Sequence, residues 1–100
     1  MAALFIIQAS VVDDPDGRAR YKADQARVQP LIAAHGGRYR ASGVGLDVLE
    51  GAHDGRRLVV FEFPSMAALR GFWDSPAYAE LKALRAGAAC IDAWAVPAEP

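Results

Sequence analysis

The stretch RRLVVFEF occupies residues 56–63 and is followed by Pro64. Val and Phe are typical of strands, and proline cannot donate a ladder hydrogen bond, so this stretch predicts a strand that ends at Phe63. Residues 3–12 form a second run rich in Ile, Val and Phe. In both runs, apolar residues occupy both alternating positions, which is typical of strands covered on both faces.

Two helical segments separate the predicted strands. Asp14-Pro15 is a typical helix start, because Asp caps free amides and Pro fits the first turn. The apolar spacing predicts a helix that is kinked at Pro30 and ends at Gly36-Gly37. Ser65 predicts the start of a second helix, and Ser75-Pro76 predicts that it breaks and starts again. The apolar stripe of the first helix consists of Tyr21, Val28, Leu31, Ile32 and His35.

Residues 38–49 and 90–96 are predicted as the two remaining strands, with Gly43 and Gly45 weakening the first or marking a bulge. The element order is then βαββαβ, which predicts an α+β, ferredoxin-like fold. Its four-stranded sheet is antiparallel-dominated, in the order 4-1-3-2, with both helices on one face. The other face would expose apolar residues of 3–12 and 56–63. A homodimer that stacks sheet on sheet would cover them.

Length and charge exclude several classes of protein. The chain has 100 residues, enough for one domain, which we assign to residues 1–97 with a frayed tail at 98–100. Its net charge of −1 provides no basic field for nucleic acid or an anionic membrane. The longest apolar stretch is too short to cross a bilayer and lacks signal-peptide features, so we expect a cytoplasmic protein. The single cysteine, Cys90, cannot form an internal disulfide and is expected to be buried and reduced.

Glu62 is the leading candidate for a catalytic acid or base, because it lies within a strand of Val and Phe. A carboxylate buried there must be paired or have a raised pKa. Either state suits a general base, but a structural ion pair with an arginine explains Glu62 equally well. Arg38 and Arg40 share one strand face and could clamp a small carboxylate or an enolate, or could lie at a solvated edge. Arg57 could pair with Glu50 or Glu62.

The predicted helix faces carry aromatic side chains with polar tips. Tyr21, Trp73 and Tyr78 could form the wall of a small apolar pocket, or could fill the core with their tips hydrogen-bonded. Arg85 lies two helical turns after Tyr78 and could reach a substrate anion or a neighbouring carboxylate. His35, His53 and Cys90 have no metal-ligand spacing, so we expect no metal site and no cofactor.

Taken together, these segments resemble a bacterial family described as domain of unknown function 1330, within the dimeric α/β-barrel superfamily. The resemblance covers about residues 3–96 and implies a ferredoxin-like fold and a homodimer, but no activity. Superfamily relatives include cofactor-free monooxygenases, muconolactone isomerases and haem-dependent enzymes, so the fold does not select a reaction. The matching residues are Asp14-Pro15, Tyr21, Pro30, Gly36-Gly37-Arg38, Leu49-Glu50-Gly51, Arg57 to Val59, Glu62 to Ser65, Trp73, Ser75-Pro76, Tyr78, Lys82 and Arg85.

Three functions remain open on the sequence alone. The first is a cofactor-independent enzyme that acts by proton abstraction or oxygenation on a small, partly anionic organic molecule, in a pocket between the sheet and the helices. Glu62 would be its base and Arg38, with Arg40, would hold developing negative charge. The second is a module that binds a metabolite without turnover. The third is a structural homodimer in which aromatic side chains fill the space.

Overall fold

The computed structural model describes residues 1–11, 14–42 and 46–98. The strands form one sheet in the order β2-β3-β1-β4, and every neighbouring pair is antiparallel. This is the predicted order, and it confirms the ferredoxin-like α+β fold. The strands are β1 (Ala3–Val11), β2 (Arg38–Ser42), β3 (Arg57–Phe63) and β4 (Ala89–Pro97), and the helices are α1 (Pro15–Ala34), α2 (Met66–Trp73) and α3 (Pro76–Arg85).

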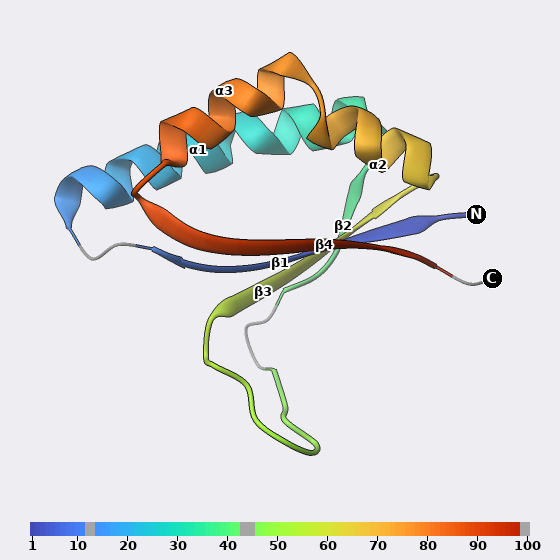
Figure 1. Cartoon of the computed structure of the whole chain (residues 1–100), viewed down its shortest axis with the longest axis horizontal. Helices are drawn as coiled ribbons and strands as arrows, with labels where there is room; N and C mark the ends of the chain where they lie inside the picture. The colour runs from blue at the N-terminus through green and yellow to red at the C-terminus, as the bar shows by residue number, and fades with distance from the viewer. Residues whose placement is uncertain (12–13, 43–45, 99–100) are drawn as a thin grey trace.

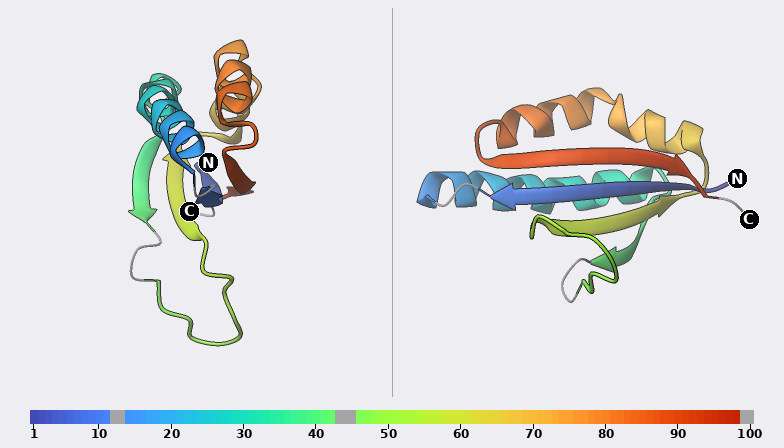
Figure 2. Two further views of the ribbon diagram at one scale, coloured as in Figure 1. Left: turned by 90° about the vertical axis from the view of Figure 1, so that its left-hand side faces the viewer. Right: turned by 60° about the horizontal axis from the view of Figure 1, so that its bottom comes forward.

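All three helices lie on one face of the sheet (Figure 1). Figure 2 shows α1 and α3 side by side above the strands, with α2 continuing the line of α3. The opposite face carries no helix, so the sheet has a helix face and an open face. No helix of the described residues is both long enough and apolar enough to cross a membrane.

Local capping fixes where the helices begin, as the sequence predicts. Asp14 Oδ1 accepts a hydrogen bond from the Gly17 amide at 2.7 Å. Ser65 Oγ accepts from the amide of Ala68 at 3.0 Å, and Ser75 Oγ accepts from that of Tyr78 at 3.2 Å. The Ser75 cap separates α2 from α3, and α1 continues through Pro30 to Ala34.

Aromatic side chains form the core between the sheet and α2. Phe5 of β1 and Phe63 of β3 point to the helix face and are almost fully buried. Both contact the ring of Phe72 in α2, with ring centroids 5.6 Å apart in each case. These contacts fill the space under α2.

The open face displays the alternate residues of the same strands. Trp94 and Val96 of β4 are 45% and 38% exposed, although both are apolar. Cys90 lies on this face and is exposed, so the expectation of a buried thiol is wrong. It is exposed because no helix covers this side of β4. The half-buried apolar residues of the open face are Leu4, Ile6, Leu58 and Val60.

The second strand is shorter than predicted. It ends at Ser42, and residues 46–49 form no strand. Leu49 is 95% exposed, so the apolar residues there do not continue a strand face. The register shift that the structure shows lies between Tyr39 and Ala41, whereas Gly43 and Gly45 lie outside the described residues.

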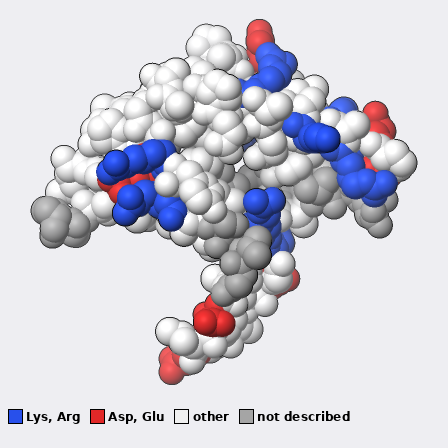
Figure 3. All heavy atoms as spheres, turned by 180° about the vertical axis from the view of Figure 1, so that it is seen from behind, with Lys and Arg blue, Asp and Glu red and all other residues white. Residues whose placement is uncertain are grey.

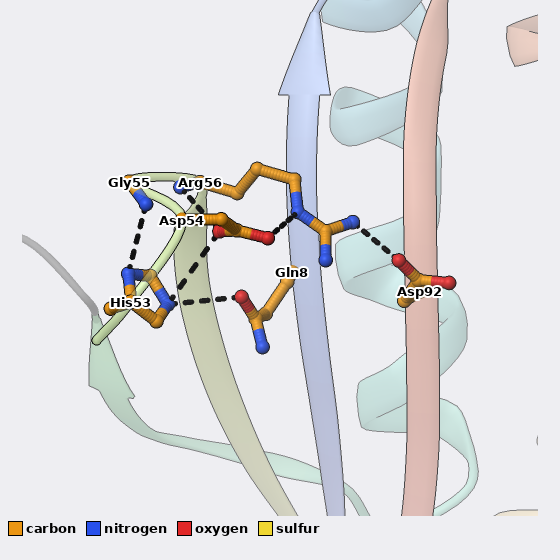
Figure 4. Close-up of polar contacts among 6 residues, drawn as sticks. All are labelled: Gln8, His53, Asp54, Gly55, Arg56 and Asp92. Atoms are coloured by element: carbon orange, nitrogen blue, oxygen red, sulfur yellow. Dashed lines mark hydrogen bonds and ion pairs between the residues drawn. The ribbon is translucent and has the colours of Figure 1, made fainter. Parts of the chain in front are cut away.

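The segment 46–56 projects from the open side of the sheet as a loop (Figure 3). Its base is fixed by polar contacts, shown in Figure 4. Arg56 pairs with Asp54 and with Asp92 of β4. His53 Nδ1 accepts from the Gly55 amide at 3.1 Å, which leaves Nε2 as the donor to Gln8 Oε1 at 2.9 Å. The loop is therefore attached to β1 and β4.

The end of the chain remains attached to β1 as far as the structure describes it. The Ala98 amide donates a hydrogen bond to the Ala2 carbonyl at 2.8 Å. The rest of the predicted tail, residues 99–100, lies outside the described residues.

Candidate functional site

A cavity of about 90 Å³ lies between the helix face of the sheet and helices α1 and α3. Its sheet side is mostly apolar, with Ile7, Val59 and Phe61 among the lining residues. Its helix side carries polar groups, because α1 contributes Tyr21 and Asp24 at helical spacing beside the apolar Val28 and Ile32. A small, mainly apolar hollow with a few polar groups is typical of a site for a small organic molecule.

Asp24 is the least expected residue in this cavity. Its side chain is 2% exposed, and one carboxyl oxygen, Oδ2, accepts from Gln25 Nε2 at 3.2 Å. The other oxygen, Oδ1, is buried and has no hydrogen-bond partner among the residues that the structure describes. Burial raises the pKa of Asp24, against the opposing effects of Arg85, the Gln25 hydrogen bond and Arg27.

Tyr78 and Arg85 of α3, the helix beside α1, also line the cavity. Arg85 Nη2 donates a hydrogen bond to the Tyr78 hydroxyl oxygen at 3.1 Å. Burial raises the pKa of Tyr78 although Arg85 lowers it, so the phenol stays protonated at neutral pH. Because its oxygen accepts from Arg85, the phenolic hydrogen remains available for a ligand.

Tyr21 and Arg57 complete the polar part of the cavity. Burial raises the pKa of Tyr21, and the charge of Asp24 raises it further, whereas Arg57 and Arg85 lower it. One carboxyl group, phenols and two guanidinium groups therefore line the same cavity. Arg57 begins β3 and is exposed, so its charge lies at the solvent side of the cavity.

The other predicted site residues gather on the open face. Glu62 follows Phe61 in β3, and since Phe61 and Phe63 face the helices, Glu62 faces away from them. Arg38 Nη2 lies 3.4 Å from one Glu62 oxygen, and Arg40 Nε lies 3.3 Å from the other. These three side chains form a surface ion-pair cluster and do not line the cavity.

Trp73 lies next to the cavity but lines a different hollow, between α2 and β4. Its ring contacts Tyr78, with centroids 5.0 Å apart, and Lys82 Nζ lies 4.0 Å above it. Trp73 therefore packs against Tyr78 without lining the cavity itself. The described residues contain no group of His, Cys, Asp and Glu that could hold a metal ion.

Comparison with known proteins identifies the family. The family model described as Domain of unknown function (DUF1330) matches residues 2–98. The chain belongs to this family. No curated protein matches the DUF1330 chain at a significant level.

Solved structures share the fold of this DUF1330 protein at low sequence identity. RPA0582 from Rhodopseudomonas palustris, a protein of unknown function, is 23% identical with a TM-score of 0.72, over 99% of this chain and 84% of that chain. A dimeric ferredoxin-like protein of unknown function from Jannaschia sp. CCS1 is 11% identical with a TM-score of 0.70, over 98% and 100% of the two chains. SnoaB from Streptomyces nogalater, a cofactor-independent oxygenase, is 14% identical with a TM-score of 0.66, over 99% and 94%. At these identities, the likeness shows the fold alone.

Sequence reasoning about this DUF1330 protein missed Asp24 and placed Arg57 elsewhere. Asp24 lies in the predicted apolar stripe of the first helix, three residues after Tyr21 and four before Val28. A carboxylate within an apolar stripe is the signal that could have identified it. Arg57 pairs with neither Glu50 nor Glu62 among the described residues, because its position in β3 turns it to the helix face.

Proposed function

We propose that this DUF1330 protein is a cofactor-independent enzyme that moves a proton on a small, partly anionic organic molecule bound between the sheet and the helices. The buried, unpartnered Oδ1 of Asp24 carries the proposal. An unsatisfied carboxyl oxygen costs free energy, and a bound ligand could satisfy it. A raised pKa also makes the carboxylate of Asp24 a stronger base than that of an ordinary aspartate.

In the proposed reaction, Asp24 in its carboxylate form takes a proton from a carbon next to a carbonyl group. The electron pair of the broken C–H bond moves to the carbonyl oxygen and gives an enolate. The Tyr78 hydroxyl, which accepts a hydrogen bond from Arg85, donates to that oxygen. Asp24 then returns the proton, at the same carbon or at another atom, so that the enzyme is regenerated without an added reactant.

The fold is compatible with an enzyme that needs no cofactor, because SnoaB, with the same fold, is a cofactor-independent oxygenase. An enolate could also react with O₂ in the present protein, which keeps oxygenation as a second outcome of the same first step. The assignment of Glu62 as base and of Arg38 as anion clamp remains a competing prediction. It would require the substrate to bind on the open face.

We propose that the protein forms a homodimer through its open faces. The Jannaschia protein and a second solved structure, from Thermobifida fusca YX, are described as dimeric and ferredoxin-like. A dimer would cover Trp94 and Val96 together with the half-buried apolar residues beside them. It would leave the Asp24 cavity, on the helix face, free to bind a ligand.

The test is proton exchange in heavy water. Small ketones and keto acids are incubated with the protein in D₂O, and NMR follows the replacement of C–H by C–D next to the carbonyl. The protein should accelerate exchange for at least one compound, and Asp24→Asn should slow it roughly 100-fold or more. Asp16→Asn, on the exposed part of the same helix, is the matched control and should retain the rate.

The competing base is tested in the same assay. If Glu62→Gln abolishes exchange while Asp24→Asn does not, the active site lies on the open face and the proposal is wrong. If no compound exchanges faster with protein than without it, proton transfer on carbonyl compounds is also ruled out. Circular dichroism spectra of the variants establish that they are folded.

A further inference from the structure

We infer that the cavity selects a small monocarboxylic acid, whose carboxylate is bound by Arg57 and Arg85. The inference rests on the proposed function in that it concerns the same cavity, and it names the class of substrate. It depends on three observations: which arginines form ion pairs, the charge of the cavity lining and the size of the cavity.

Arg57 and Arg85 differ from the other arginines in their partners. Six arginines form ion pairs with carboxylates, and Arg18 also has an interaction. Within the described residues, Arg57 and Arg85 pair with no carboxylate, although both line the cavity. The paired arginines are Arg20, Arg27, Arg38, Arg40, Arg56 and Arg70.

The charged side chains of the cavity favour a monoanion. Two guanidinium groups and one carboxyl group, that of Asp24, line the cavity. With Asp24 as a carboxylate, the form in which it acts as a base, the lining carries one excess positive charge, which one bound carboxylate would neutralise. A doubly charged phosphate would meet Asp24 and would lack the cradle of backbone amides that usually binds it.

The position of Arg57 orients the ligand. Arg57 is exposed at the start of β3, whereas Asp24 is buried, so the carboxylate would remain partly hydrated near the opening. The rest of the molecule would contact Ile7, Val59 and Phe61. The hollow of about 90 Å³ is smaller than the cavity of about 150 Å³ that holds benzene in a well-studied case. A short aliphatic chain therefore fits better than an aromatic ring.

Butyrate and butyramide are suitable probes, because they have nearly the same shape and differ in charge. Titration followed by NMR should give butyrate about tenfold tighter binding than butyramide. Arg57→Gln should remove most of this preference. Arg70→Gln, which breaks a surface pair with Asp74, is the matched control and should retain it.

Several results would overturn the inference. These are equal binding of the two probes, no binding of either at millimolar concentration, or a preference that is lost in Arg38→Gln and kept in Arg57→Gln. The last result would place the anion on the open face, as the sequence alone suggested.

The outcome can be separated from that of the proposed function. Asp24→Asn should bind butyrate at least as tightly as the unmodified protein, because it removes a nearby negative charge, while it loses proton exchange. Selective butyrate binding without any exchange would support the ligand class and contradict the enzyme. Exchange on neutral ketones without a preference for butyrate would contradict the ligand class but support the proton-transfer activity.

Discussion

Asp24 combines two properties that rarely occur together in a small domain. It is nearly inaccessible to solvent, and one of its oxygens has no hydrogen-bond partner among the described residues. Core carboxyls of this kind usually reduce stability and are retained at functional sites. The same residue should therefore limit stability and support activity.

Asp24→Asn tests the stability cost. The pKa of Asp24 is raised in the folded state, so the folded protein binds this proton more tightly than the unfolded chain. The stability that results is fully present at pH below the ordinary pKa of Asp. It is lost as the pH rises through the raised pKa, because a buried carboxylate then forms. Asp24→Asn should therefore gain on the order of 1 kcal/mol at pH 8 and less near pH 4. Urea unfolding at both pH values measures this, and a variant less stable than the parent at pH 8 would contradict it.

The sequence predicted the residue types of the cavity better than their positions. Helical spacing drew attention to Tyr21, Tyr78 and Arg85, which the structure brings to one cavity. The predicted strand drew attention to Glu62, because an acidic residue among Val and Phe suggests burial. Strand alternation turns Glu62 to the open face, and the register that decides this cannot be seen in a single sequence.

At the scale of elements, short-range signals predicted the helices well. The caps at Asp14, Ser65 and Ser75 act within three residues, so the local sequence contains them. The strand predicted over 38–49 was too long, because strand pairing depends on a partner that is distant in the chain. Leu46 and Val48 carry the apolar pattern without a partner, and both are exposed.

Gly37 and Gly71 differ in the space around them, and alanine substitutions at the two positions test how closely the elements pack there. A Cβ at Gly37 would lie 2.5 Å from Ile32 Cγ2 and 2.8 Å from the Phe63 ring, so Gly37→Ala should cost about 1–3 kcal/mol. Gly71 lies within α2, where a Cβ would meet only His35 at 3.7 Å. Gly71→Ala should therefore gain about 0.5–1 kcal/mol. Thermal unfolding of both variants measures this, and equal effects would contradict the close packing of Gly37.

At the scale of the whole molecule, no helix of the described residues covers the open face of the sheet. It contains a continuous set of apolar side chains around Trp94. The loop 46–56 projects past this face and carries Leu49 fully in solvent. Both features suit a second copy of the chain placed against the sheet.

Light scattering tests this assembly. At micromolar concentration, we expect a mass of twice the 10.7 kDa of one chain. Trp94→Asp would place a charge in the interface and should weaken dimerisation about tenfold or more. Ala67→Asp, exposed on α2 and on the helix side of the sheet, is a control for added charge. A 10.7 kDa species alone for the unmodified protein would rule the dimer out.

The alternation of β3 gives neighbouring residues different roles. Arg57, Val59 and Phe61 line the cavity, and Leu58, Val60 and Glu62 face the other way. The proposed ligand site and the proposed dimer interface can therefore change separately, one substitution at a time. The insertion of a single residue within β3 would exchange the two sets and disturb both properties at once. Relatives should accordingly differ in the residues of this strand far more readily than in its length.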